Sequence, residues 1–397
     1  MDHLHTKSGW SIPMKTAAIL LMAGGLQALS LAWPVDGTFK GQSQGWLQYA
    51  SMLALAFYVD RSESAKQAFA SAWMFSFAWL IGSIWWLFIS MNRYGGLAVP
   101  LAALAVILMA MGLAIFYGLA AALYHRVCNK QMSALAKAGA FAAVWVLAEM
   151  VRGTLWTGFP WGAVGYAHVD GVLRFWAPWV GVYGLCAMVA FFAMALIAER
   201  QDRRPPARTA QMVALAIGVV IAYAGFSLPS RMTADTHLSA QPLRVTLLQG
   251  NIPQDLKFGE GVNLALRGYR DALLASASDL TVTPETAIPL IQQQMPDRYW
   301  RDLETHFSKG QQAALIGLPL ATRSEQGQLQ YSNSVVALMP QANPSSTASY
   351  QYNKYHLVPF GEFVPPLFQW FVRLMNIPLG DFTRGDVAQP SLVFKGE

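Results

Sequence analysis

The sequence predicts an α-helical transmembrane bundle of about seven spans, followed by an α/β domain. Hydrophobic residues make up 54% of the 397-residue chain and charged residues only 13%, roughly half the charged share of a soluble protein. Residues 1–228 carry 15 basic and 8 acidic side chains, whereas residues 229–397 carry 13 and 14. Because the basic excess lies between apolar runs, membrane topology explains it better than nucleic-acid binding, which we exclude.

Seven apolar runs predict the membrane spans of residues 1–228. Since a span needs about 20 apolar residues, the two short runs, the second and the fifth, must extend into their flanks. The runs cover residues 16–33, 46–59, 68–90, 97–124, 139–151, 175–198 and 211–228.

Loop charge predicts the orientation of the bundle. The N-terminus and loops 60–67, 125–138 and 199–210 together carry eleven Lys and Arg residues, and the loops on the other side carry four. Positive loops stay in the cytoplasm. An odd number of spans then places residues 229–397 outside, on the periplasmic side of a bacterial inner membrane.

Residues 229–242 form a polar linker, and residues 243–397 alternate strands with helices. Strands are predicted at 243–248, 280–283, 313–318, 334–338 and 350–356, and helices at 260–277 and 297–309. This alternation is typical of a layered α/β domain. Only two cysteines occur, Cys128 and Cys186, and histidines are few and scattered, so we expect no metal, no cofactor and no disulfide framework.

Three charged side chains in the α/β domain are candidates for catalysis. Glu285 follows a strand and a proline, and Lys354 closes another β-rich run. Glu362 lies in an aromatic, proline-rich segment that carries few charges. Taken alone, Glu285 is typical of a solvated loop carboxylate. Its interpretation as a catalytic residue therefore depends on all three residues together.

Four motifs resemble bacterial apolipoprotein N-acyltransferases. They are the membrane loop at residues 157–162 and three soluble segments at residues 249–254, 283–289 and 353–362. The resemblance covers nearly the whole chain, and it implies an αββα sandwich of the nitrilase type for residues 243–397. It also implies transfer of an acyl chain from a membrane phospholipid to the N-terminal amine of a diacylglyceryl-cysteine apolipoprotein, through a thioester.

The resemblance implies a role for each matching residue. Glu285 would be the general base, Lys354 would stabilise the oxyanion, and Glu362 would support the site. Asn333 matches an asparagine near the family's site. Trp161, in an aromatic stretch that also reads as an ordinary interfacial belt, would help to line a lipid entry route.

The family's nucleophile is a cysteine on a later strand, followed by a last span, and neither occurs in this sequence. Cys128 and Cys186 lie in the apolar part, where small buried packing roles are expected. We therefore expect the α/β domain to be incomplete at its C-terminus and the chain, as written, to be inactive.

Other interpretations remain open at this stage. Glu149 and Arg152 are three residues apart at the end of a predicted span. They have two interpretations, an ion pair or a functional site in the membrane. A membrane-anchored amidase of nitrilase type would use water as the acceptor. A non-catalytic protein would bind phospholipid or lipoprotein only. A transporter ranks last, because the spans carry few ionisable or helix-breaking residues.

Overall fold

The computed structural model divides the chain into two compact units, Met1–Thr236 and His237–Glu397. The predicted run 211–228 and nearly all of the predicted linker lie outside the described residues. The structure describes residues 12–129, 131–201, 242–253, 256, 259–340, 350–359, 361–364 and 382–395.

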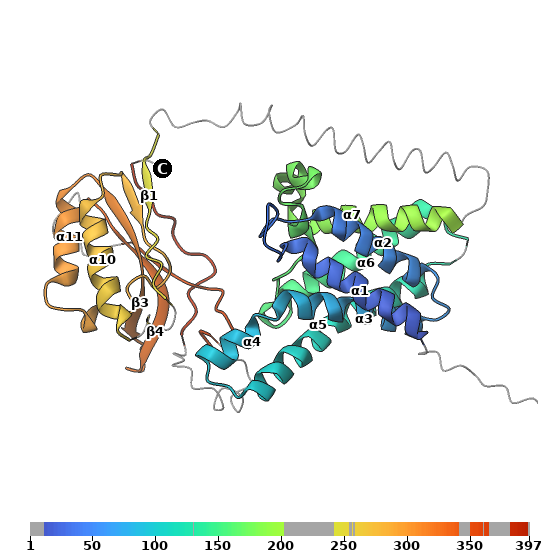
Figure 1. The fold of residues 1–397 in the computed structure, drawn as a ribbon. Helices are drawn as coiled ribbons and strands as arrows, with labels where there is room; N and C mark the ends of the chain where they lie inside the picture. The colour runs from blue at the N-terminus through green and yellow to red at the C-terminus, as the bar shows by residue number, and fades with distance from the viewer. Residues whose placement is uncertain are drawn as a thin grey trace, which may run out of the picture. The chain divides into compact units, whose positions relative to one another are not determined.

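The first unit is a bundle of helices (Figure 1). Five segments, at Met14–Leu31, Ala65–Ile84, Val99–Val127, Ala134–Thr157 and Val172–Ala198, are long and apolar enough to cross a membrane. These segments confirm five of the seven predicted runs as candidate spans. The main helices are α1 (Met14–Leu31), α2 (Gly45–Asp60), α3 (Ala65–Ile84), α5 (Val99–Val127), α6 (Ala134–Thr154) and α7 (Ala177–Gln201).

The two short runs form helices longer than their apolar cores. The run at 46–59 becomes the 16-residue α2, and the run at 139–151 becomes the 21-residue α6. The Ser133 hydroxyl accepts a hydrogen bond from Ala136 N at 3.2 Å at the start of α6. A serine cap satisfies one of the amide groups left open at a helix start, so α6 begins before its apolar residues do.

Two predicted runs are interrupted. Within the run at 68–90, helix α3 ends at Ile84. The chain then continues through the short α4 (Leu87–Ile89) and a π-helical turn, Ser90–Tyr94. Helix α7 contains a kink at Gly181, whose φ is 61°. Left-handed backbone of this kind favours glycine, and hydrophobicity alone could not reveal it.

The core of the bundle combines small and aromatic side chains. Helix α3 packs against α1 and α5, and α6 packs against α5 and α7. Alanines such as Ala72, Ala110 and Ala114 are buried at these contacts, where small residues let helices approach closely. Trp79 and Tyr117 add a cluster of rings, with centroids 5.1 Å apart.

The second unit contains a five-stranded mixed sheet in the order β1-β2-β3-β4-β5 (Figure 1). Strand β2 pairs in parallel with β1 and with β3, whereas β4 pairs antiparallel with β3 and with β5. The strands are β1 (Val245–Leu247), β2 (Leu280–Val282), β3 (Ala313–Arg323), β4 (Leu329–Leu338) and β5 (Gln351–Asn353).

Helices α10 (Gly261–Ala275) and α11 (Tyr299–Lys309) cover one face of this sheet (Figure 1). Leu273 and Phe307 from the helices are buried in one core with Ile316 from β3. The predicted strands and helices of the α/β domain are confirmed in type and order. Strands β3 and β4 are longer than expected, and β1 and β5, predicted at 243–248 and 350–356, are only three residues long. The αββα sandwich stays a prediction, because the described residues form a single sheet.

Candidate active site

The loop that carries Glu285 begins where the parallel strand β2 ends. Residues at the carboxyl ends of parallel strands are well placed for ligands. Thr283 Oγ1 accepts a hydrogen bond from Gly317 N at 3.0 Å, and Ile288 N donates to Gly317 O at 3.2 Å. A side chain at Gly317 would place its Cβ 2.3 Å from Pro284 O, so only glycine lets β3 approach the loop this closely.

Lys354 and Asn333 are neighbours across the antiparallel ladder. Asn333 lies within β4, and Lys354 follows directly after β5, with Lys354 N donating to Asn333 O at 2.8 Å. Alternate residues of a strand point to opposite faces. Since Val336 and Leu338 belong to the core beneath α10 and α11, Asn333 lies on the opposite face.

Glu362 is buried and fixed by its own loop. Its Oε2 atom accepts a hydrogen bond from Val358 N at 2.7 Å, and its backbone N donates to Val358 O at 2.9 Å. Phe382 N donates to Glu362 O at 2.9 Å. These bonds hold the carboxylate in one orientation, as required of a residue that positions others.

The four side chains meet in one cluster. Lys354 Nζ lies 2.8 Å from Glu285 Oε1 and 3.1 Å from Glu362 Oε1. Asn333 Nδ2 donates to the same two oxygens, at 2.5 Å each. Two carboxylates are thus held together by one cation and one amide, in the part of the chain that was predicted to carry the chemistry.

Exposure differs across the cluster. The Glu285 side chain is 59% exposed, that of Lys354 27% and that of Glu362 11%. Burial lowers the pKa of the Lys354 ammonium, but its hydrogen bonds to Glu285 and Glu362 outweigh burial, and the net pKa is raised above 10.5. Lys354 therefore stays positively charged at neutral pH, while Glu285 remains accessible to a substrate.

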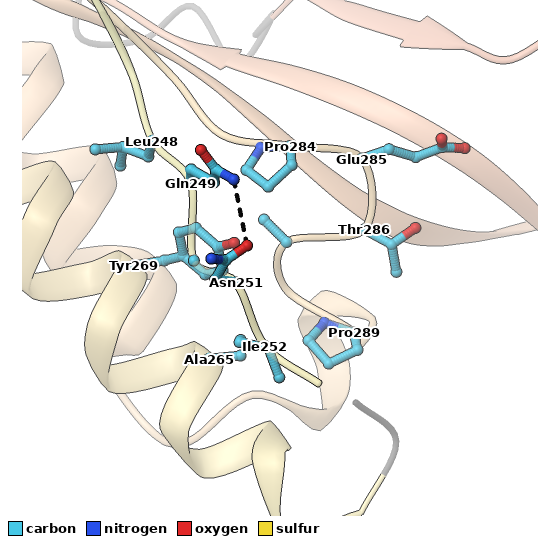
Figure 2. Close-up of a pocket in the computed structure, with 12 residues that line it drawn as sticks. Leu248, Gln249, Asn251, Ile252, Ala265, Tyr269, Pro284, Glu285, Thr286 and Pro289 are labelled. Atoms are coloured by element: carbon cyan, nitrogen blue, oxygen red, sulfur yellow. Dashed lines mark hydrogen bonds between the residues drawn. The ribbon is translucent and has the colours of Figure 1, made fainter. Parts of the chain in front are cut away.

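A cavity of about 240 Å³ lies beside Glu285. Its lining includes Gly250, Asn251, Tyr269 and Pro289. Figure 2 shows the Glu285 carboxylate extending away from Tyr269, so it lies at the rim of the cavity. A substrate group at this rim would contact the carboxylate without entering the core.

Three residues that fix the site were not found from the sequence. Gly317 admits the Glu285 loop, as described above. Gln389 donates to Asn353 O at 2.7 Å and accepts from Asn353 N at 2.8 Å, which clamps the residue before Lys354. Gly385 N donates to Lys354 O at 3.1 Å. Their partners are distant in sequence, so no local pattern marks them.

Trp161 lies in the other unit, in a loop after α6. Its ring is 48% exposed and contacts the rings of Trp86 and Phe159, with centroid distances of 5.0 and 5.3 Å. Arg152 and Glu149 form the predicted ion pair, at 2.9 Å, with both side chains fully buried. The ion-pair interpretation of these two residues is therefore confirmed.

The cysteines pack within the helical unit, as expected. Cys186 is buried in the bundle core, and its Sγ accepts a hydrogen bond from Gly165 N at 3.1 Å. Cys128 is partly buried against the same core. Among the described residues, no group of three or more His, Cys, Asp and Glu side chains is placed to hold a metal.

The cluster combines an accessible carboxylate with an ammonium ion. An accessible carboxylate can accept a proton from a nucleophile. An ammonium ion beside it can stabilise negative charge on a carbonyl oxygen. A buried second carboxylate and an amide keep both in place.

Known proteins with similar sequences identify the family of this chain. The family profile described as the apolipoprotein N-acyltransferase N-terminal domain matches residues 23–195. Proteins named apolipoprotein N-acyltransferase from Verminephrobacter eiseniae, Ralstonia nicotianae and Azotobacter vinelandii are 43%, 39% and 33% identical. The matches cover 98%, 89% and 98% of this chain and 71%, 65% and 72% of those proteins. The chain therefore belongs to the apolipoprotein N-acyltransferases, a family of membrane enzymes.

Proposed function

We propose that this protein transfers an acyl chain from a membrane phospholipid to the N-terminal amine of a diacylglyceryl-cysteine apolipoprotein. The observation that carries the proposal is the cluster in which Lys354 and Asn333 bridge Glu285 and Glu362. It supplies a base and an oxyanion partner beside a cavity. The relatives' name, apolipoprotein N-acyltransferase, supports the same reaction.

In the first half-reaction, a thiol sulfur bonds to the ester carbonyl carbon of the phospholipid and the ester C–O bond breaks. Glu285 takes the thiol proton and returns it to the departing lysophospholipid oxygen. Lys354 stabilises the negative oxygen of the tetrahedral intermediate. The resemblance assigns this sulfur to a cysteine that the family carries on a later strand than those of residues 243–397, not to Cys128 or Cys186.

In the second half-reaction, the apolipoprotein amine bonds to the thioester carbon and the C–S bond breaks. Glu285 takes a proton from the amine and returns it to sulfur, which regenerates the thiol. The thioester divides a difficult ester-to-amide exchange into two easier steps. Glu362 and Asn333 hold Glu285 and Lys354 at the same separation through both halves.

Both substrates are lipid-anchored, so we place the reaction at the outer face of the bacterial inner membrane. The loop charges support a periplasmic location for the α/β unit. We propose that this unit is of the nitrilase type and follows seven spans. Trp161 is half-exposed and lies in a loop that follows a helix apolar enough to cross a membrane. Tryptophan at the end of a span prefers the lipid headgroup region. We assign Trp161 to contact with the phospholipid.

Two other functions use the same groups differently. A membrane-anchored amidase would pass the acyl group to water. A non-catalytic protein would bind phospholipid or lipoprotein without transfer. The several apolar helices favour a lipid substrate, because a soluble amide would need no more than a single anchor.

The test supplies protein expressed from the complete gene with phosphatidylethanolamine and a synthetic diacylglyceryl-cysteine peptide. Mass spectrometry follows the peptide and the released lipids. The proposal predicts an N-acylated peptide and an equal amount of lysophospholipid. Hydrolysis of an added soluble amide without acylated peptide would indicate the amidase, and bound lipid with neither product would indicate a binding protein.

A further inference from the structure

One buried side chain of the helical unit holds the loop that carries Trp161. Arg152 Nη1 donates to Phe159 O, at 2.5 Å, and to Trp161 O, at 2.8 Å. In return, Phe159 N donates to Arg152 O at 2.7 Å. A guanidinium group presents several donors in a fixed plane, so it can fix two carbonyl groups at once.

The other side of Arg152 is fixed as well. Its Nε donates to the Tyr117 hydroxyl at 2.7 Å, and its Nη2 donates to Glu149 Oε2 at 2.9 Å. Tyr117 in turn donates to Glu149 Oε1 at 2.8 Å. The guanidinium carbon lies 5.7 Å from the centre of the Trp79 ring. These contacts leave Arg152 a single orientation.

The loop itself has a backbone shape that most residues avoid. Trp156, Thr157 and Gly158 have φ values of 53°, 79° and 78°. A Cβ at Gly158 would lie 1.9 Å from Gly153 O. Left-handed backbone in residues other than glycine persists only where surrounding contacts impose it. The hydrogen bonds between Arg152 and Phe159 close the turn that contains these three residues.

A buried ion pair contributes little to stability compared with apolar side chains of similar size. What an apolar pair could not do is hold the carbonyl groups of Phe159 and Trp161. We therefore propose that Arg152, oriented by Glu149 and Tyr117, is a positioning residue for phospholipid binding, because it sets the ring of Trp161. This inference rests on the proposed function.

The chain offers a matched control for this role. Tyr124, on the same helix α5 as Tyr117, donates to Asp60 Oδ1 at 2.8 Å, and Lys137 Nζ lies 3.3 Å from the same oxygen. Tyr117→Phe and Tyr124→Phe each remove one hydroxyl that contacts a buried ion pair. Only Tyr117 contacts the residue that holds the loop.

The experiment combines kinetics with fluorine NMR on fluorotryptophan-labelled protein. The experiment uses protein from the complete gene, and the Trp161 signal is identified by its loss in Trp161→Phe. Tyr117→Phe is expected to move that signal and to raise KM for phosphatidylethanolamine roughly tenfold, because small misplacements near a substrate have large effects. The kcat value stays within about twofold, and Tyr124→Phe changes neither the signal nor KM.

Equal KM increases in both variants, or an unchanged Trp161 signal in Tyr117→Phe, would overturn the inference. Arg152→Lys extends the test, since a single ammonium group cannot reach both carbonyl oxygens and Glu149 together. If the wild-type protein transfers no acyl group, the proposed function fails. In that case the NMR comparison alone decides whether Arg152 sets Trp161.

Discussion

Each unit of the molecule contains a network in which a basic side chain, one or two carboxylates and a neutral polar side chain contact one another. In the helical unit, Arg152 and Glu149 are bridged by Tyr117, and the charged side chains are fully buried. In the α/β unit, Lys354 contacts two carboxylates that share Asn333 as a donor. The Glu285 carboxylate in that network is 59% exposed.

The difference in exposure separates two uses of the same chemistry. A fully buried pair cannot exchange protons with a substrate, and its value lies in the groups that it holds. A carboxylate at a cavity rim can accept a proton, while its buried partners keep it in place. We therefore expect mutations in the first network to change stability and phospholipid binding, and mutations in the second to change the rate of the chemical reaction.

The largest expected effect is on folding of the helical unit. Glu149→Ala leaves Arg152 charged and unpaired in the bundle, which costs about 3–5 kcal/mol. Glu285→Ala removes a partly exposed pair and costs at most about 1 kcal/mol. Unfolding of both variants in detergent measures this contrast, and equal losses would break the distinction between the networks.

The next effect is on catalysis. Lys354→Met removes the charge that stabilises the oxyanion, so kcat falls about 10²- to 10³-fold. The apparent Tm changes by a few degrees at most, because the ion pair with Glu285 is partly exposed to solvent. Single-turnover acyl transfer with saturating phospholipid is the measurement. A kcat within threefold of wild type would remove Lys354 from the mechanism.

Asn333→Ala sharpens the role of the bridging amide. It removes the donor to both carboxylates, and hydrogen bonds to charged groups contribute about 1.5–3 kcal/mol each. We expect kcat to fall roughly tenfold, because the two carboxylates then repel one another. Ser332→Ala is the control: Ser332 bonds to Ser334 and Asn353 in the same strands, and its loss leaves the rate unchanged.

The smallest effect is a pH dependence of stability. The pKa of Lys354 is raised above 10.5 in the folded protein. Its ion pairs therefore stabilise the fold fully below that pH, and the contribution is lost as pH rises through the folded pKa. The stability difference between wild type and Lys354→Met, at most about 1 kcal/mol, should hold from pH 7 to pH 10. Its disappearance by about pH 9 would contradict the raised pKa.

The order of elements could be predicted from the sequence. Apolar runs and strand-forming segments are local, so helix α6 and strand β3 appear near their predicted positions. The kink at Gly181 and the π-helical turn after α4 depend on backbone geometry rather than hydrophobicity. Those features could not be predicted from composition.

The site was only partly predictable. Glu285, Lys354 and Glu362 stood out by their positions after strands and in an apolar segment, and the structure brings them together with Asn333. Gly317 and Gln389 could not be found, because each acts on a partner more than thirty residues away in sequence. These contacts form only when the distant segments come together in the folded protein.

The most direct test is the single-turnover rate of peptide N-acylation by Glu285→Gln, measured on protein from the complete gene. Gln keeps the shape of the side chain but cannot accept a proton. The account predicts a rate at least about 10²-fold below wild type, with unfolding in detergent unchanged within about 1 kcal/mol. A rate within threefold of wild type would show that Glu285 is not the base and would contradict the proposed mechanism.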